Sequence, residues 1–480
     1  MSDESENAPF EDPGRFLDAP GVGEADSVGV PPVQDEEATP GTPLEPIASF
    51  EREESLDVLR GFAVLGILAM NIYFFGMPAA AYSNPSLFGG ASGLPLVTWV
   101  FTHLFFEVKF MTIFSALFGA GLVVMFQRAQ AKRRPLAKVY YRRILWLLVI
   151  GLVHAYALWL GDILVTYAIA GLLIFLFRRR SPRALIIVGC SVLVIPSLMA
   201  LGFGVYVHKM QTAKSEIAAL SAAGEEPSEE QQKLAESWKE MRPQFAPTPE
   251  EIEEELETYR NGYIGMVRDR APRALMMQTT ATAFFTLWRA GGVMLLGMAL
   301  MKLGVLSARR SRQFYRRCIA WGLGLGLPLV VLSAWDLMRV NWQIPHTVQI
   351  SSHLNYYGSL AMALAYVGIV MLGCKSRALP RLRHRLSAAG RMAFSNYILQ
   401  TILCTTVFYG YGLGLFGHLN RFWLMPFVVA IWILQLWVSP WWLRRFQYGP
   451  LEWLWRSLTY WHRQPMVARA TESPTGGSVA

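Results

Sequence analysis

Residues 57–77 read DVLRGFAVLGILAMNIYFFGM, an almost unbroken apolar run near the start of the chain. A helix of about 20 apolar residues spans the roughly 30 Å hydrocarbon core of a bilayer, so this run predicts a transmembrane helix. The whole 480-residue chain has the same character, because 53% of its residues are hydrophobic and only 16% are charged. Soluble proteins average about 25% charged residues. A soluble enzyme with one membrane anchor is therefore excluded, and we expect a chain that lies mostly within the bilayer.

Similar apolar runs recur along the chain, and each is continuous rather than alternating in character. Strands of a membrane barrel alternate between apolar and polar residues over segments of about ten, so continuous runs favour helices. The predicted fold class is therefore all-α, a polytopic transmembrane helical bundle with about ten spans. The predicted spans are 57–77, 95–126, 142–160, 162–178, 184–207, 274–303, 314–335, 354–374, 390–411 and 422–443.

The loops between these spans differ sharply in charge. The loops after the second, fourth, sixth, eighth and tenth spans are rich in Lys and Arg. In the alternate short loops the basic residues are only Arg339 and Arg421. The positive-inside rule places basic loops in the cytoplasm. We therefore expect both termini on the cytoplasmic side of a bacterial-type cytoplasmic (inner) membrane.

Both ends of the chain, residues 1–50 and 463–480, are predicted to be disordered. The first 50 residues hold twelve acidic side chains and a single base, Arg15, and are rich in Pro, Gly and Ala. Such a segment cannot bury enough apolar surface to fold on its own.

The membrane part divides into a first half, 51–207, with spans 1–5, and a second half, 274–462, with spans 6–10 and an aromatic tail.

Residues 208–273, between the two halves, are polar and helix-prone, and the topology predicts that they form an extracytoplasmic insert. Thr248-Pro249-Glu250-Glu251 is a typical helix start, with Thr as N-cap, Pro in the first turn and Glu at the capping-box position. The insert has no compact apolar pattern. A solvated helical cap over the bundle is therefore favoured over a separate catalytic domain.

Ionisable side chains inside membrane spans cost roughly 2.5–3.5 kcal/mol each on insertion scales, so each one calls for an explanation. The first span places Asp57, Arg60 and Asn71 on nearly one helical face, together with Val64 and Ile67. Arg60 is a candidate anchor for a phosphate or a carboxylate. The alternative is an interfacial Asp57–Arg60 salt bridge that begins the helix.

Two further spans carry candidate acid–base groups. His103 and Glu107 are four residues apart, so the carboxylate can orient the imidazole, while Lys109 points to the opposite side. At the junction of the third and fourth spans, His154 is either inter-helix glue or a proton-transfer group. Asp162 is a candidate N-cap for the fourth span.

Arg289 lies within the sixth span and is expected to need a carboxylate partner, for which Glu107 and Asp57 are the candidates. In the ninth span Asn396 and Gln400 share one face, where they either line a polar cavity or make inter-helix hydrogen bonds. Polar groups in at least five spans together predict a cavity that handles a polar or charged molecule.

Several blocks of the chain carry a family resemblance, over about residues 52 to 462. The opening Leu56-Asp57-Val58-Leu59-Arg60-Gly61 with Asn71 resembles the first signature of the YeiB-like integral membrane proteins, also known as domain of unknown function 418. The other blocks that resemble this family are 107–121, 154–164, 288–289, 390–397 and 448–456.

This family is distantly similar to transmembrane acyltransferases such as the heparan-glucosaminide acetyltransferase, which share the Asp-x-x-Arg-Gly opening. The similarity implies transfer of an acyl group from cytosolic acyl-CoA to a polar acceptor, with Arg60 meeting the CoA phosphates. Those enzymes use a His in the loop after the first span. Residues 78–94 contain no His, so His103 or His154 would have to take that role.

Three hypotheses about function stay open. The first is a membrane-bound acyltransferase, with catalytic candidates His154, His103 and Glu107. Candidates for holding acyl-CoA are Arg60, Lys109 and Asp57, and candidates for binding the acceptor are Asn71, Asp162, Arg289, Asn396 and Gln400. The second hypothesis is a secondary transporter of a small polar or anionic solute, and the third is a structural or regulatory membrane protein.

The shape of the cavity separates these hypotheses. A tunnel open at Arg60 with a His inside favours acyl transfer, whereas a closed midplane pocket between symmetric halves favours transport. Expected partners are the lipid bilayer and a small polar acceptor or solute, with a homodimer left open. Neither nucleic acid nor a metal is expected, since the basic loops suit anionic lipid and the four cysteines form no CxxC motif.

Overall fold

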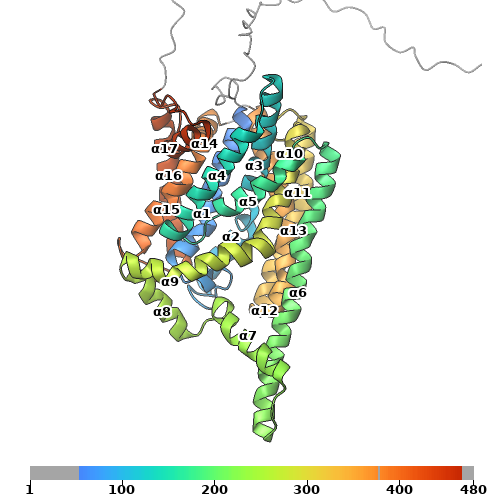
Figure 1. The fold of residues 1–480 in the computed structure, drawn as a ribbon, viewed down its shortest axis with the longest axis vertical. Coiled ribbons are helices and arrows are strands. Elements are labelled where there is room, and N and C mark those ends of the chain that lie inside the picture. The colour runs from blue at the N-terminus through green and yellow to red at the C-terminus, as the bar shows by residue number, and fades with distance from the viewer. Residues whose placement is uncertain (1–52, 377–378, 468–480) are drawn as a thin grey trace, which may run out of the picture. The chain divides into compact units, whose positions relative to one another are not determined.

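The computed structural model describes residues 53–376 and 379–467, and these residues contain helices and no β-strand. Figure 1 shows the long helices packed side by side. The predicted all-α, polytopic helical bundle is confirmed. The predicted acidic tail 1–50 and residues 468–480 of the predicted C-terminal tail lie outside the described residues.

The chain forms the following helices in order. The first half contains α1 (Glu54–Gly76), η2 (Ala79–Tyr82), α2 (Gly93–Phe105), α3 (Lys109–Ala131), α4 (Ala137–Val153), η3 (His154–Leu158), α5 (Leu164–Ile174), η4 (Phe175–Phe177) and α6 (Pro182–Ala223). The insert adds α7 (Glu229–Phe245), α8 (Pro249–Arg260) and α9 (Tyr263–Met276). The second half contains η5 (Met277–Thr286), α10 (Leu287–Lys302), α11 (Arg312–Arg339), α12 (Ile344–His346), η6 (Thr347–Ser351), α13 (Ser352–Ser376), α14 (Pro380–Arg391), α15 (Ala393–Phe408), α16 (Arg421–Leu443) and α17 (Pro450–Tyr460).

Eight helical segments of the described residues are long and apolar enough to cross a bilayer. Two shorter apolar helices, Leu164–Phe177 and Ala393–Phe408, coincide with the fourth and ninth predicted spans. Each of the ten predicted spans therefore falls on a helix. The fifth differs most from its prediction, because α6 continues without interruption from the predicted end at residue 207 to Ala223.

The two ends of the bundle differ in composition. At the basic end, near the top of Figure 1, α1 begins beside α14, and α17 lies at the same end; the insert helices α7, α8 and α9 lie lower in the picture. The predicted helix start at Thr248 is present. The Thr248 hydroxyl accepts a hydrogen bond from the Glu251 N–H, and the Glu251 carboxylate accepts one from the Thr248 N–H, which completes the capping box of α8.

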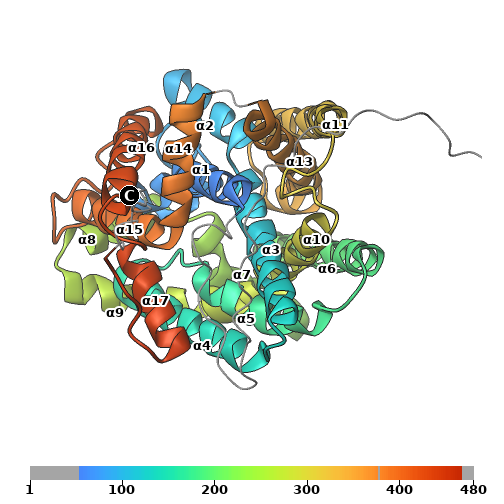
Figure 2. The same cartoon turned by 90° about the horizontal axis from the view of Figure 1, so that it is seen from above.

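Seen from the basic end, α1 and α3 lie near the middle, with α6, α11 and α13 on one side and α14, α15 and α16 on the other (Figure 2). Glycines allow the central helices to approach closely. A Cβ atom on Gly61 of α1 would collide with the Leu386 carbonyl of α14, and one on Gly390 of α14 would collide with the Asp57 carbonyl of α1. Small residues commonly mediate helix contacts in membranes.

Two membrane helices are interrupted where they carry ionisable residues. Between α2 and α3, Val108 has a left-handed backbone with φ of 67°, which a β-branched residue rarely adopts. After α4, the π-helical turn η3 begins at His154, and the Trp159 N–H donates to the His154 carbonyl at 2.8 Å. π-Helical turns often occur at functional sites. These interruptions direct attention to Glu107, beside Val108, and to His154.

Candidate functional site

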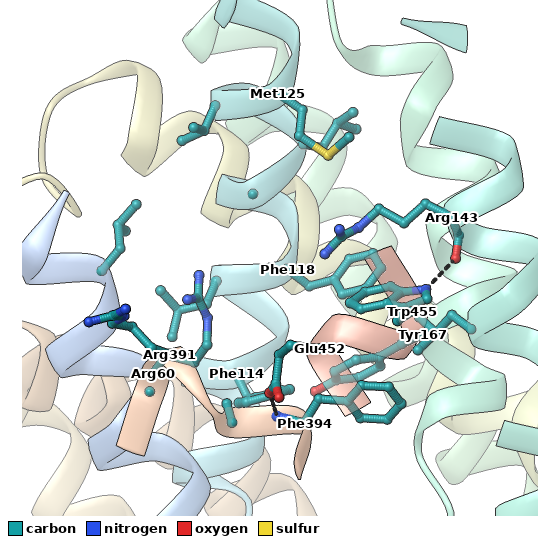
Figure 3. Close-up of a pocket in the computed structure, with 18 of the residues that line it drawn as sticks. Arg60, Phe114, Phe118, Met125, Arg143, Tyr167, Arg391, Phe394, Glu452 and Trp455 are labelled. Carbon is teal, nitrogen blue, oxygen red and sulfur yellow. Dashed lines mark hydrogen bonds between the residues drawn. The ribbon is translucent and has the colours of Figure 1, made fainter. Parts of the chain in front are cut away.

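A pocket of about 270 Å³ lies at the basic end, between helices of both membrane halves (Figure 3). The first predicted stripe lines it, since Asp57, Arg60, Val64 and Ile67 of α1 are all wall residues. Asn71, the inner end of that stripe, is partly buried and is not one of the described wall residues. The pocket therefore lies along the part of the α1 face that is nearest the basic end of the bundle.

The wall of the pocket carries more basic than acidic groups. Its five arginines come from five helices: Arg60, Arg128, Arg143, Arg391 and Arg456. Its acidic groups are Glu53, Asp57 and Glu452.

The arginines are held by aromatic and acidic neighbours. Arg60 forms an ion pair with Asp57 at 2.6 Å. The Arg143 guanidinium lies 3.7 Å from the centre of the Trp455 ring, and the Trp455 indole N–H donates to the Arg143 carbonyl at 2.9 Å. Arg143 is also repelled by Arg456 and Arg60. Like charges that converge in a partly enclosed space favour an anion between them.

Below these charges the pocket is apolar and aromatic. Phe114 and Phe118 of α3 project into it together with Tyr167 of α5 and Phe394 of α15 (Figure 3). Tyr397, one turn further along α15, completes the wall. The pocket thus combines a cationic rim with an apolar interior, which suits a ligand that has an anionic end and an uncharged end.

Glu452 and Ser395 connect two helices that line the pocket. The Glu452 carboxylate accepts hydrogen bonds from the backbone N–H groups of Phe394 at 2.7 Å and Ser395 at 3.1 Å, at the beginning of α15. In return the Ser395 hydroxyl accepts one from the Leu451 N–H at 3.0 Å, at the beginning of α17. Each side chain satisfies N–H groups that the first turn of the other helix leaves unpaired. Burial raises the pKa of Glu452 above its ordinary value.

This pKa shift predicts how stability depends on pH. A carboxyl whose pKa is higher in the folded state binds its proton more tightly there, so folding is favoured below the ordinary carboxyl pKa and loses that contribution as pH rises through the folded-state value. Thermal unfolding of the purified protein in detergent should therefore show a midpoint that falls as pH rises above about 4.5. In Glu452→Gln the fall should be smaller. Identical pH profiles for the two proteins would contradict the assignment.

His154 lies next to the inner part of the pocket, behind Tyr397. Its ring is 5.2 Å from the Tyr397 ring, and the side chain is 1% exposed. The His154 Nδ1 is 2.7 Å from the Asp162 Oδ1, and its Nε2 is 3.0 Å from the Thr401 hydroxyl. The Asp162 Oδ2 also accepts a hydrogen bond from the Val165 N–H at 2.8 Å. The N-cap residue of α5 is Ile163, one residue later than predicted, but the Asp162 side chain still accepts a hydrogen bond in the first turn of α5 and also orients His154.

His103, Glu107 and Lys109 form a separate cluster at the interruption between α2 and α3. The His103 Nδ1 lies 2.5 Å from the Glu107 carboxylate, as the spacing predicts. The buried Lys109 ammonium donates to the His103 carbonyl at 2.6 Å and to the Asn355 amide oxygen at 3.0 Å. Lys109 thereby satisfies a carbonyl at the end of α2, and the structure does not bring it together with Arg60.

The predicted carboxylate partner of Arg289 is wrong. Within the described residues Arg289 forms no salt bridge, and its guanidinium donates to the hydroxyls of Thr112 at 3.1 Å and Ser359 at 2.8 Å. It also lies 4.2 Å from the centre of the Tyr356 ring. Uncharged acceptors and an aromatic face take the place of a counter-charge, because the Arg289 side chain on α10 reaches Thr112 of α3 and Tyr356 and Ser359 of α13.

Asn396 and Gln400 join helices rather than line the pocket. The Asn396 amide donates to the Ala389 carbonyl and to the Ser439 hydroxyl, each at 3.0 Å. The Gln400 amide donates to the Val64 carbonyl at 3.2 Å and to Gln435 at 2.9 Å. These contacts correspond to the inter-helix hydrogen bonds that the sequence left open. The predicted polar residues thus divide among several local groups and do not share one chamber.

Some residues of the site have only a weak signal in the sequence. Arg143 and Arg391 count there as ordinary basic loop residues, and Glu452 and Arg456 lie in the aromatic tail after the last span. Thr401 has no signal, because a hydroxyl inside a helix usually bonds to its own backbone. Only the packing of α4, α14, α15 and α17 brings these side chains together.

Comparison with known proteins places the chain in a family. A family model described as a protein of unknown function (DUF418) matches residues 300–462. The uncharacterized protein YeiB of Escherichia coli (strain K12) is 31% identical over 428 residues, which cover 88% of this chain and 100% of that protein. The uncharacterized protein YxaH of Bacillus subtilis (strain 168) is 29% identical over 444 residues, which cover 89% of this chain and 98% of that protein. No solved structure matches. Together with its membrane-spanning helices, these similarities show that the chain belongs to the YeiB-like family of multi-pass membrane proteins.

Proposed function

We propose that this protein is a membrane-bound acyltransferase that takes an acyl group from cytosolic acyl-CoA and passes it to a polar acceptor. The observation that carries the proposal is the pocket, whose cationic rim and apolar interior lead toward the His154–Asp162 pair. Arginine matches phosphate geometry with paired donors, so the rim suits the phosphate groups of CoA. The uncharged thioester end then lies in the aromatic interior, toward His154.

The charge of the loops supports a cytosolic pocket. The basic loops lie at the same end of the bundle as the pocket, and the positive-inside rule places such loops in the cytoplasm. Acyl-CoA is a cytosolic metabolite whose net negative charge would be attracted to this end. On this orientation the 208–273 insert covers the opposite, extracytoplasmic end.

In the proposed reaction His154 acts as general base. Asp162 accepts the Nδ1–H, which leaves the Nε2 lone pair available for a proton. The hydroxyl or amine that attacks the thioester carbon loses its proton toward Nε2. The new C–O or C–N bond forms, the C–S bond breaks, and the proton passes from the imidazole to the departing CoA thiolate.

Binding of radiolabelled acetyl-CoA to the purified protein tests the pocket. Arg391→Gln and Arg456→Gln should each weaken binding by about 10–100-fold, since a hydrogen bond to a charged group is worth about 1.5–3 kcal/mol. Arg444 is exposed at the same end and does not line the pocket, so Arg444→Gln is the matched control and should bind like wild type. Equal affinity in all four proteins would exclude this rim as the CoA site.

Catalysis is tested by following release of CoA from acetyl-CoA in the presence of membrane extract. Wild type should release CoA and place the label on an acceptor, whereas an absence of both product and CoA release would remove the acyltransferase proposal.

Secondary transport of a small polar or anionic solute is the second candidate. It is favoured by the interruption between α2 and α3, where Glu107 lies in the turn between the two helices and the buried Lys109 begins α3. Transport predicts that Lys109→Met abolishes solute accumulation in proteoliposomes and that no acyl group leaves acetyl-CoA.

A further inference from the structure

We propose that Thr401 is the nucleophile of the reaction, so that acyl transfer proceeds through an acyl-threonine intermediate. The inference rests on the proposed function and deepens it, because it specifies which group first accepts the acyl chain. It is carried by the arrangement of Asp162, His154 and Thr401, and by two buried hydrogen-bond donors next to them that lack acceptors.

The three side chains form a continuous chain of hydrogen bonds from a carboxylate to a hydroxyl. Asp162 is fixed by the beginning of α5, where its Oδ2 accepts the Val165 N–H. Its Oδ1 lies 2.7 Å from His154 Nδ1, and His154 Nε2 lies 3.0 Å from the Thr401 Oγ1. A carboxylate on Nδ1 selects the tautomer in which Nε2 accepts a proton from the hydroxyl. These are the roles of base, orienting group and nucleophile in hydroxyl-based acyl transfer.

The Thr401 hydroxyl is directed at His154 rather than at its own helix. Threonines in membrane helices usually donate to the carbonyl one turn earlier. Thr98 and Thr112 do so here, each at 2.8 Å. For Thr401 the corresponding distance, to the Tyr397 carbonyl, is 3.4 Å, longer than its 3.0 Å contact with His154. The shorter contact is therefore the one with the base.

Two donors beside His154 have no hydrogen-bond acceptor among the described residues. The Trp159 indole N–H and the Tyr397 hydroxyl are buried, and their rings lie 6.2 and 5.2 Å from the His154 ring. A buried unpaired polar group costs about 1–3 kcal/mol, so two of them in one place point to a missing acceptor. The oxyanion of a tetrahedral intermediate would supply that acceptor.

Tyr397 also links the relay to the pocket. It lines the pocket with its ring and lies one turn before Thr401 on α15, so the apolar interior ends next to the nucleophile. An acyl chain that enters past Phe394 meets Tyr397 before it reaches the Thr401 hydroxyl.

The first half-reaction balances without any further reagent. The Thr401 oxygen attacks the thioester carbon while its proton moves to His154 Nε2, and the collapse of the tetrahedral intermediate breaks the C–S bond. His154 gives the proton to the CoA thiolate, which leaves. In the second half-reaction the acceptor loses a proton to His154 and attacks the ester carbon, and the Thr401 oxygen regains its proton as the C–O bond breaks.

Isotope exchange tests the intermediate without an identified acceptor. The purified protein is incubated with unlabelled acetyl-CoA and tritiated CoA, and formation of tritiated acetyl-CoA is measured. Exchange without acceptor requires that the acyl group stay on the protein while CoA departs. Wild type and Thr401→Ser should exchange, whereas Thr401→Val, which keeps the shape and removes the hydroxyl, should lose exchange by at least about 1,000-fold.

Thr405→Val is the matched control, because Thr405 is equally buried one turn further along α15 and its hydroxyl donates to the Ile402 carbonyl at 3.2 Å. It should exchange like wild type. Peptide mapping after acetylation should place a label on Thr401 that mild base removes as an ester.

The possible failures are distinguishable. If Thr401→Val still transfers the acyl group to an acceptor and wild type shows no isotope exchange, the acyl-threonine intermediate is overturned. The acyltransferase proposal then holds, with direct transfer from acyl-CoA to the acceptor. If wild type shows neither isotope exchange nor release of CoA, the acyl-threonine intermediate and the acyltransferase proposal are both overturned. Label on a residue other than Thr401 would also overturn the inference.

Discussion

Asp162→Asn should lower acetyl-CoA turnover by about 10³–10⁴-fold while leaving the protein folded. Asparagine is a good N-cap, so its oxygen can keep the bond to the Val165 N–H at the beginning of α5. Its amide group, however, would donate toward His154 Nδ1. The imidazole would then carry its proton on Nε2 and could no longer accept one from Thr401 or from an acceptor. The loss should appear in turnover at saturating acetyl-CoA.

A thermal midpoint close to that of wild type is the control for this variant, and Asp162→Ala, which removes both the cap and the orienting group, should lower both activity and stability. His154→Ala should resemble Asp162→Asn in activity. Turnover within tenfold of wild type in Asp162→Asn would mean that Asp162 serves only as a helix cap. His154 would then be a buried contact between helices and not a general base.

The helical spans could be predicted because length and hydropathy act locally: a continuous apolar run must become a helix inside the bilayer. Beyond the predicted end of the fifth span the sequence becomes polar, but α6 continues as a helix. Its end at Ala223 could therefore not be located from hydropathy. The π-helical turn at His154 also has no local signal.

The site was predictable only where one helix decides the geometry. Asp57, Arg60, Val64 and Ile67 share a face by periodicity, and all four line the pocket. Neighbours on other helices depend on packing. Periodicity alone therefore cannot predict that Arg143 and Arg456 line the same pocket as Arg60, or that Arg289 is satisfied by hydroxyls on α3 and α13.

Gly390→Val should strongly destabilise the bundle and disturb the pocket at the same time. A side chain at position 390 would collide with the Asp57 carbonyl of α1, and neither backbone can move without the other. Overpacking of a tight core costs about 1–3 kcal/mol, and here the clash involves backbone rather than a flexible side chain. Separation of α1 from α14 would also move Arg60 away from Arg391, since each lies within a few residues of the contact. Loss of folded protein in detergent and loss of acetyl-CoA binding should therefore appear together.

The matched control is Gly324→Val, because Gly324 also lies within a membrane helix, is exposed, and would place its Cβ in open space. It should be neutral or slightly stabilising, since valine restricts the unfolded chain more than glycine does. Gly61→Val approaches the same crossing from α1 and should reproduce the effect of Gly390→Val. If Gly390→Val kept the unfolding midpoint and acetyl-CoA affinity of Gly324→Val, the close α1–α14 crossing would be refuted. The position of Arg60 in the pocket rim would then have no support from this contact.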